Sequence, residues 1–267
     1  MLFDNKEVVM RLFEFGDLDG VSNLYHIYLR EYLVFFYKVF GYYKLWVPSF
    51  SNFIKRVGKN KYLECCSGAG EPLTLIDSQL DKNEVGLVNY LLSDIRPNPD
   101  VVNKFNQNQL SRFRYIENPV DVTQDLDKFD CPKIFINSFH HFSKKQVEKI
   151  LINNFKNKNE IVVLEYVSNS LLGYLSMTVG PLVVFLTLPF LVKLRHLPIM
   201  ALFTYVFPLF PLMMLWDGIV SCLHEHSVED LKQIVNKLGL DIEISAEKKR
   251  SMLYPAGVSF LTITFPE

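Results

Sequence analysis

An acid, a group of small residues and two glycines stand together in residues 62–72, which read YLECCSGAGEP. Gly68 and Gly70 let the backbone approach a ligand where a side chain would clash. Glu64, at the end of the apolar run before them, can accept hydrogen bonds from a hydroxyl or a cation. A strand that ends in an acid and turns through glycines into a helix is typical of a nucleotide-binding cradle.

Three further polar groups follow apolar runs later in the chain. Asp94, in LLSDIRPN, falls about two dozen residues after the glycines, where a carboxylate could grip both hydroxyls of a ribose. Asp121, in NPVDV, is either an adenine-reading residue or, equally, a helix cap or turn residue. NSFHHF would place Asn137, His140 and His141 at the mouth of a sheet. Ligands of parallel sheets bind at the carboxyl ends of the strands, so one shared site is expected.

The adjacent histidines indicate acid–base chemistry. His140 or His141 could act as general base for a hydroxyl or amine acceptor, and the other would pack or orient. CLHEHS, with Cys222, His224 and His226, does not have the spacing of a closed zinc site. We therefore expect no metal.

The four cysteines form no paired CxxC spacing, so neither a disulfide framework nor a zinc knuckle is indicated. Cys65 and Cys66 are interpreted as small buried residues at a crowded turn. Asp217 and Gly218, in LWDGIVSCL, are interpreted as a helix terminus at an interface, with Trp216 as an aromatic anchor. The alternative is a polar contact at the rim of a substrate pocket.

Alternating strand and helix patterns would position these groups. Residues 60–166 contain five apolar runs separated by helix-like stretches, which indicates a parallel sheet with helices on both faces. The runs are KYLECC, VGLVNYLLSD, FRYIENPVDV, CPKIFINSF and EIVVLEYV. SVEDLKQIVNKLGL then predicts a helix that Ser227 caps and Gly239 stops. DIEISAEKK and AGVSFLTITF predict a final antiparallel pair.

Two regions are unusually apolar for a chain that is 49% hydrophobic with mean hydropathy +0.12. Residues 1–58 predict aromatic-rich helices that pack on a core or, alternatively, form a lid over an apolar ligand or a membrane-surface anchor. Residues 171–216 predict a helical hairpin whose two uncharged arms, Leu171–Val192 and Leu197–Trp216, are each about 20 residues, the length that spans a bilayer. Five prolines and the cationic turn KLRH favour a shallow, re-entrant or interfacial hairpin. A hairpin buried in a soluble core or dimer interface is the alternative.

The motifs together resemble those of class I S-adenosylmethionine-dependent methyltransferases. LECCSGAG, LSDIRPN, VDVTQDLDKFD and INSFHHF resemble the first four motifs, and the match covers roughly residues 60–166 and 226–265. The resemblance implies an α/β fold: a doubly wound, mostly parallel, seven-stranded Rossmann-like sheet with helices on both faces and an antiparallel last strand. The N-terminal helices and the hydrophobic hairpin would be additions to a methyltransferase domain at residues 59–267. Cys66 stands where the family usually has glycine.

The resemblance also implies S-adenosylmethionine as cofactor and histidines at the acceptor. The positions that it assigns to cofactor binding are Glu64, Gly68, Ala69, Gly70, Asp94, Ile95, Asp121, Val122 and Asn137. A dinucleotide fits less well, because Glu71 would place negative charge beside a diphosphate, whereas a sulfonium is cationic. No GxxxxGK[ST] occurs, which excludes a P-loop.

We therefore expect a methyltransferase that acts on an apolar, membrane-derived small molecule such as a lipid, isoprenoid or quinone-like compound, at the cytoplasmic face of a membrane. The alternatives are a soluble small-molecule methyltransferase with an enclosed apolar pocket and a non-catalytic methyltransferase-fold binding protein. Nucleic acid is not an expected partner, because a formal net charge of −1 provides no basic field.

Overall fold

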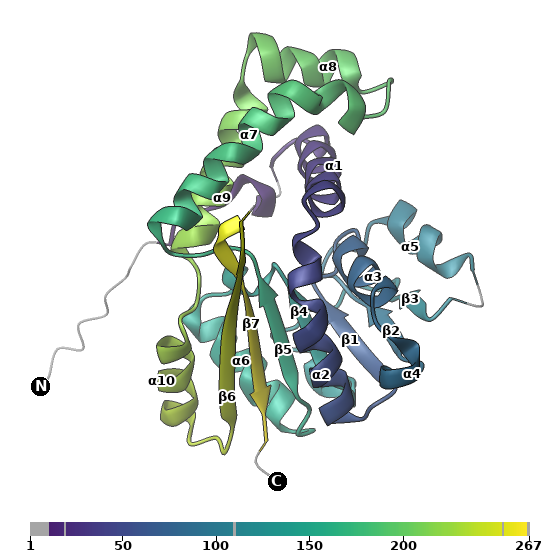
Figure 1. Cartoon of the computed structure of the whole chain (residues 1–267), viewed down its shortest axis with the longest axis vertical. Helices are drawn as coiled ribbons and strands as arrows, with labels where there is room; N and C mark the ends of the chain where they lie inside the picture. The colour runs from purple at the N-terminus through teal and green to yellow at the C-terminus, as the bar shows by residue number, and fades with distance from the viewer. Residues whose placement is uncertain (1–10, 19, 109–110, 253, 266–267) are drawn as a thin grey trace, which may run out of the picture.

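The computed structural model describes residues 11–18, 20–108, 111–252 and 254–265. Over these residues the chain forms a seven-stranded sheet in the order β3-β2-β1-β4-β5-β7-β6 (Figure 1). The strands are β1 (Lys61–Cys65), β2 (Asn89–Leu92), β3 (Phe113–Tyr115), β4 (Lys133–Ile136), β5 (Ile161–Glu165), β6 (Glu243–Ser251) and β7 (Tyr254–Thr264).

The α-helices alternate with the strands and also form a separate group. They are α1 (Asn23–Phe40), α2 (Val47–Val57), α3 (Glu71–Ser78), α4 (Lys82–Val85), α5 (Pro99–Asn106), α6 (Lys144–Phe155), α7 (Leu171–Leu191), α8 (Leu197–Ala201), α9 (Leu209–Leu223) and α10 (Val228–Leu238). The short 3-10 helices are η1 (Phe15–Asp17), η2 (Tyr42–Leu45), η3 (Leu126–Lys128) and η4 (Phe139–His141), and the π-helix is η5 (Leu202–Val206).

The predicted doubly wound sheet is confirmed. β1 pairs in parallel with β2 and β4, β2 with β3, and β4 with β5, while β7 is antiparallel to both of its neighbours. The predicted caps of α10 are also present: the Ser227 hydroxyl accepts from the Asp230 amide, and Gly239 ends the helix in the left-handed conformation.

Two predicted strands were too long. The third ends at Tyr115, so Asp121 and Val122 lie in a loop beyond it. Pro119 stands between them and the strand and has no amide proton to donate to a sheet ladder. The second run was predicted to begin at Val85, but Val85 ends α4, and β2 begins at Asn89.

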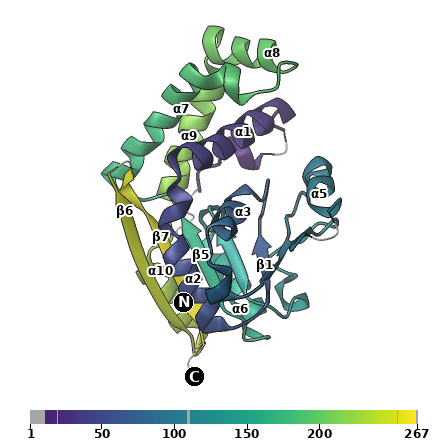
Figure 2. The ribbon, with the colours of Figure 1, turned by 45° about the vertical axis from the view of Figure 1, so that its right-hand side comes forward.

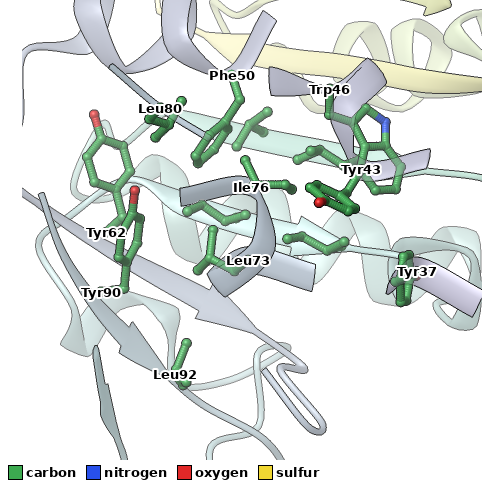
Figure 3. Close-up of a cluster of buried hydrophobic side chains, with 14 of the residues drawn as sticks. Tyr37, Tyr43, Trp46, Phe50, Tyr62, Leu73, Ile76, Leu80, Tyr90 and Leu92 are labelled. Atoms are coloured by element: carbon green, nitrogen blue, oxygen red, sulfur yellow. The ribbon is translucent and has the colours of Figure 1, made fainter. Parts of the chain in front are cut away.

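Two apolar layers cover the sheet, one on each face. Successive side chains of a strand point to opposite faces, so Ile134 joins one layer and Phe135 the other. The first layer packs α2, α3 and α5 on the sheet. Figure 3 shows part of it, including Trp46, Phe50, Tyr62, Leu73 and Tyr90. The second packs α6 and α10 against β1, β4, β5 and β7.

A third apolar cluster joins α1 to α7, α8 and α9, on the side of the sheet where the parallel strands end (Figures 1 and 2). Ser22 caps α1, which ends at Gly41 in the left-handed conformation. The predicted N-terminal helices are present in segments: residues 11–14 and 20–22 are not helical. Residues 1–10 of the prediction lie outside the described part of the chain.

The hairpin differs from its prediction in the second arm. α7 is one helix of 21 residues, but the return arm breaks at Phe207–Pro208, with 74° between its two parts. Proline at the break removes an amide donor from the helical ladder. α9 then runs to Leu223, well past Trp216. The interpretation of Asp217 and Gly218 as a helix terminus was therefore wrong, because both lie inside α9.

Candidate functional site

A cavity of about 470 Å³ lies between the carboxyl ends of the strands and the helices above them. The strand side contributes residues from the loops after β1, β2, β4 and β5, and the helical side contributes residues from α1, α7 and α9. Its polar lining residues include Glu14, Asp17, Cys66, Asp94, Asn137, Ser138, His140, His141, Asp217 and Ser221. The cavity therefore brings together most of the polar residues selected from the sequence.

The loop after β1 adopts a left-handed backbone at three positions. Cys66, Gly68 and Gly70 have φ of 56°, 51° and 70°. A Cβ on Gly70 would lie 2.8 Å from the Phe105 ring, so this position requires glycine. Cys66 adopts a conformation that glycine favours, and it stands where the methyltransferase family that the chain resembles usually has glycine. The backbone of Cys66 is therefore strained, and the residue lines the cavity.

Asp94 joins the ends of β1 and β2. Its Oδ2 accepts from the Gly68 amide at 3.0 Å, and its Oδ1 accepts from the Arg96 amide at 2.9 Å. Burial raises the pKa of Asp94, although these two amides oppose the change. Each carboxylate oxygen has two lone pairs, so both remain able to accept from a ligand hydroxyl. Ile95, beside it, is exposed and also lines the cavity.

Glu64 lies near the end of β1, where it is shielded from water. The residue is buried, and its Oε2 has no hydrogen-bond partner among the described residues. Burial raises the pKa of Glu64 to about 8, and Asp94 and Glu71 add to the effect. A carboxyl group in this state would gain stability from a cation placed near it. Glu64 lies behind the loop and is not among the residues that line the cavity.

The other predicted cofactor residues divide between the cavity and the body of the fold. Asn137, with φ of 50°, lines the cavity; its side chain accepts from the Tyr166 amide and donates to the Tyr37 hydroxyl. Asp121 does not line it. The Oδ1 of Asp121 accepts from the amide and hydroxyl of Thr123, as in a turn. Val122 is buried in the second layer, and Ala69 is half-buried in the glycine loop. Their roles in cofactor binding stay predictions.

His140 is held by a buried carboxylate. Its Nδ1 lies 2.7 Å from Glu165 Oε2, and the Phe139 amide donates to the other Glu165 oxygen. Burial favours a raised pKa for Glu165, but the charge and hydrogen bond of His140 outweigh it and the pKa is lowered. An ionised Glu165 requires Nδ1 of His140 to be the donor, so Nε2 is the ring nitrogen that Glu165 does not hold.

His141 belongs to a second set of charged groups. Its Nδ1 lies 3.0 Å from Asp17 Oδ2 and 3.7 Å from Glu14 Oε2. Burial favours a lowered pKa for His141, but these two carboxylates outweigh it and raise the pKa to about 9. The N-terminal segment thus supplies the partners of a histidine that lies far away in the sequence.

Asp217 fixes the N-terminal segment to α9. Its carboxylate accepts from the amides of Phe15 and Gly16 at 2.6 and 3.0 Å, and from the Tyr25 hydroxyl at 2.8 Å. These bonds hold Glu14 and Asp17 over the histidines. The residue also lines the cavity, as the alternative interpretation of a polar contact at the pocket expected.

The helical wall of the cavity is apolar. It consists mainly of Leu29, Tyr32, Leu33 and Phe36 of α1, Met177, Gly180 and Pro181 of α7, and Met214 of α9. A Cβ on Gly180 would lie 2.5 Å from the Tyr32 hydroxyl, so the Tyr32 side chain would have to move if this residue were not glycine. An apolar ligand would be enclosed on this side.

Several site residues were missed from the sequence. Glu165 ends β5, so the rule that selected Asn137 could have found it. Glu14 and Asp17 gave no signal in the sequence, because contacts with residues far along the chain, among them those of Asp217, bring their segment to the sheet. In CLHEHS, whose spacing did not indicate a metal site, Cys222 is buried, His224 accepts from Arg11 and His226 contacts the Phe142 carbonyl.

Comparison with known proteins finds similarity in structure alone. No protein-family model matches the chain, and no curated protein does so. Human N-acetylserotonin methyltransferase in complex with SAM is similar with a TM-score of 0.52 and 13% identity, over 95% of this chain and 63% of that one. The plantazolicin methyltransferase BpumL in complex with SAH gives a TM-score of 0.49 and 11% identity, over 91% and 88%. The methyltransferase domain of a bacterial Hen1 gives 0.47 and 11%, over 83% and 98%.

The seven-stranded sheet and its antiparallel β7 are the arrangement that the resemblance implied. The structural similarity to the human methyltransferase indicates the same fold. The chain has the fold of the class I S-adenosylmethionine-dependent methyltransferases.

Proposed function

We propose that the protein is an S-adenosylmethionine-dependent methyltransferase whose acceptor is an apolar small molecule. The observation that carries the proposal is one cavity with two different ends. A glycine loop and Asp94 lie at one end, and a histidine pair lies at the other, beneath an apolar wall. Solved proteins of the same fold are described as bound to SAM or SAH.

The donor would bind at the glycine loop. Asp94 would accept hydrogen bonds from the ribose hydroxyls, and left-handed residues 66, 68 and 70 would bring the backbone close to it. The carboxyl group of Glu64, unpartnered at Oε2, and the nearby Asp94 favour a cationic ligand over a diphosphate. S-adenosylmethionine supplies an activated methyl group on a sulfonium, so the protein needs mainly to align the acceptor and exclude water.

The acceptor would lie between the aromatic face of α1 and the histidines. Tyr32, Phe36 and Met214 would pack on its apolar part, and its reactive atom would face His140 and His141. A neutral histidine can accept a proton from a hydroxyl or amine at Nε2, and Glu165 would fix the orientation of His140.

The hairpin would supply this acceptor from a membrane. α7 buries Gly180, Val184 and Leu188 on the inside, yet its outer face is also apolar: Leu182, Leu186 and Phe190 are 64, 80 and 84% exposed. Large exposed apolar surfaces mark sites of interaction. Among the described residues, α7 is the helix that is long and apolar enough to cross a bilayer by itself.

The basic turn of the hairpin favours an interfacial position. Lys193 and Arg195 are exposed at the tip of α7, where they could meet anionic headgroups. The break at Phe207–Pro208 and the prolines inside α7 interrupt the backbone ladder that a spanning helix must keep. The arms would therefore lie on or enter the bilayer, on the cytoplasmic face, without crossing it.

The test is incubation of purified protein with isotope-labelled S-adenosylmethionine and a lipid extract, followed by mass spectrometry. We expect label in an apolar product, and calorimetry should show donor binding. Labelled product without any need for membranes or detergent would support the soluble alternative. Donor binding with no labelled product in any lipid or small-molecule fraction would support a binding protein instead, and absence of donor binding would overturn the proposal.

A further inference from the structure

Glu14, His140 and His141 form a compact group at the acceptor end of the cavity. One ligand atom from each lies within 4.8 Å of the other two. The histidines are neighbours in η4, and Glu14 comes from the segment that Asp217 holds in place. The centroids of the His140 and His141 imidazole rings lie 4.4 Å apart. Two imidazoles and a carboxylate on one wall are a set of donors that divalent transition metals prefer.

Glu14 provides an independent observation that favours a cation as ligand. The residue is only 6% exposed, and its Oε2 accepts from the Ser221 hydroxyl at 2.9 Å. Its Oε1 has no hydrogen-bond partner in the described part of the chain, and His224 Nδ1 lies 3.7 Å from it. An unpartnered buried carboxylate oxygen is costly unless it meets a cation or a donor.

The carboxylate behind His140 is arranged as in metal sites. Histidine ligands commonly donate their second ring N–H to a carboxylate, which fixes the ring and its tautomer. Glu165 has this relation to Nδ1 of His140. Asp17, 3.0 Å from His141 Nδ1, is a further carboxylate at the edge of the group. The cavity itself leaves room on the open side of the three ligands.

We propose that Glu14, His140 and His141 bind a divalent transition-metal ion of the zinc class, with an open coordination position toward the cavity. Two imidazoles argue against Mg²⁺, which prefers oxygen ligands. The inference rests on the proposed function for its role: the ion would hold an oxygen or nitrogen of the acceptor opposite the donor site. With the ion bound, the histidines are ligands and neither is a free base. The expectation of no metal, drawn from sequence spacing, could not include Glu14.

The test is titration of chelator-treated, full-length protein with Co²⁺, followed by visible absorption, and with Zn²⁺, followed by calorimetry. We expect one equivalent to bind and the Co²⁺ absorption bands to be those of a four- or five-coordinate site. Glu14→Gln, which keeps the size of the side chain, and His141→Ala should each weaken binding more than tenfold. His196→Ala, a histidine at the hairpin tip, is the matched control and should bind as the unaltered protein does.

Absence of one-equivalent binding, or equal affinity in Glu14→Gln, would overturn the inference; the His141–Asp17 ion pair would then fill the site alone. Circular dichroism of each variant excludes loss of folding as the cause, and His141→Gln replaces His141→Ala if the latter does not fold. Calorimetry with S-adenosylmethionine separates this result from the proposed function. Metal binding without donor binding would contradict the function only, and donor binding without metal binding would contradict the metal site only.

Discussion

α10 and α7 bury one face in the same way and differ on the other. α10 packs Leu231, Ile234 and Val235 on the sheet and presents polar residues such as Lys232 and Lys237 outward. α7 packs Gly180, Val184 and Leu188 on α1 and α9, and presents leucine and phenylalanine outward. The inner faces show that both helices belong to the folded protein. The outer faces differ in the surroundings that suit them, water for α10 and an apolar phase for α7.

The largest expected effect comes from making the outside of α7 like that of α10. Replacing Leu182, Leu186 and Phe190 by Ser should lower partition to anionic lipid vesicles about a hundredfold or more, since burial of each large apolar side chain is worth ~1.5–3 kcal/mol. Vesicle sedimentation measures it. Ile152→Ser, at an exposed apolar position on α6, is the control. Equal sedimentation of the triple variant would contradict membrane docking by this face.

The tip of the hairpin tests the same comparison by charge. Lys193→Gln with Arg195→Gln should weaken binding to anionic vesicles about tenfold or more, because each basic residue near such a surface contributes ~1 kcal/mol. Binding to neutral vesicles should change little. Lys232→Gln with Lys237→Gln, on the water-facing side of α10, serves as control. If both pairs had the same effect, attraction would be a property of overall charge and not of the hairpin.

The histidines test the place where the sheet and the helical group meet. His140→Ala and His141→Ala should leave donor binding in place. At least one should lower turnover about a hundredfold, the range of general acid–base help, and as a ligand of the proposed ion either would also be needed to hold the acceptor. Glu165→Gln should lower turnover less, because it only orients His140. Single-turnover methylation and donor calorimetry separate the two steps. Normal turnover in both histidine variants would make the pair structural.

Asp94 tests the sheet side alone. Asp94→Ala should weaken S-adenosylmethionine binding more than tenfold, about 1.4 kcal/mol, by loss of charge-assisted hydrogen bonds. Asp94→Asn keeps one acceptor oxygen for the Gly68 or Arg96 amide and should bind more tightly than Asp94→Ala. Calorimetry gives both affinities. Asp121→Ala, outside the cavity lining, should have a smaller effect, and unchanged affinity in Asp94→Ala would remove the ribose assignment.

The smallest effect concerns pH and the buried carboxyl group of Glu64. Its pKa rises from 4.5 to about 8 on folding, so the folded chain without cofactor holds this proton more tightly than the unfolded chain does. Its contribution to stability is therefore complete below pH 4.5 and is lost as the pH rises through 8. Ser67, Asp94 and Glu71 are the groups that influence it. The melting temperature of Glu64→Gln should fall less between pH 5 and 8.5 than that of the unaltered chain; parallel curves would contradict this shift.

Hydrophobic periodicity was enough to predict the sheet and its helices, because a strand or helix must place its apolar residues on the side that faces the core. It did not give the length of β3, because the predicted run continued through Pro119, beyond the end of the strand at Tyr115. The prolines marked possible breaks in both arms, but α7 continues through Pro181 and Pro189, whereas the return arm bends at Phe207–Pro208.

The sequence by itself determined the elements of this protein, the glycine loop and the apolar character of the hairpin, because each depends on residues that are close along the chain. Only the tertiary structure decided which groups meet at the acceptor end. Glu14 and Asp17 reach His141 because Asp217 of α9 binds the amides of Phe15 and Gly16, and α9 itself is held by packing on α7 and α1. Contacts between residues so far apart follow from packing of the whole fold, which no local pattern encodes.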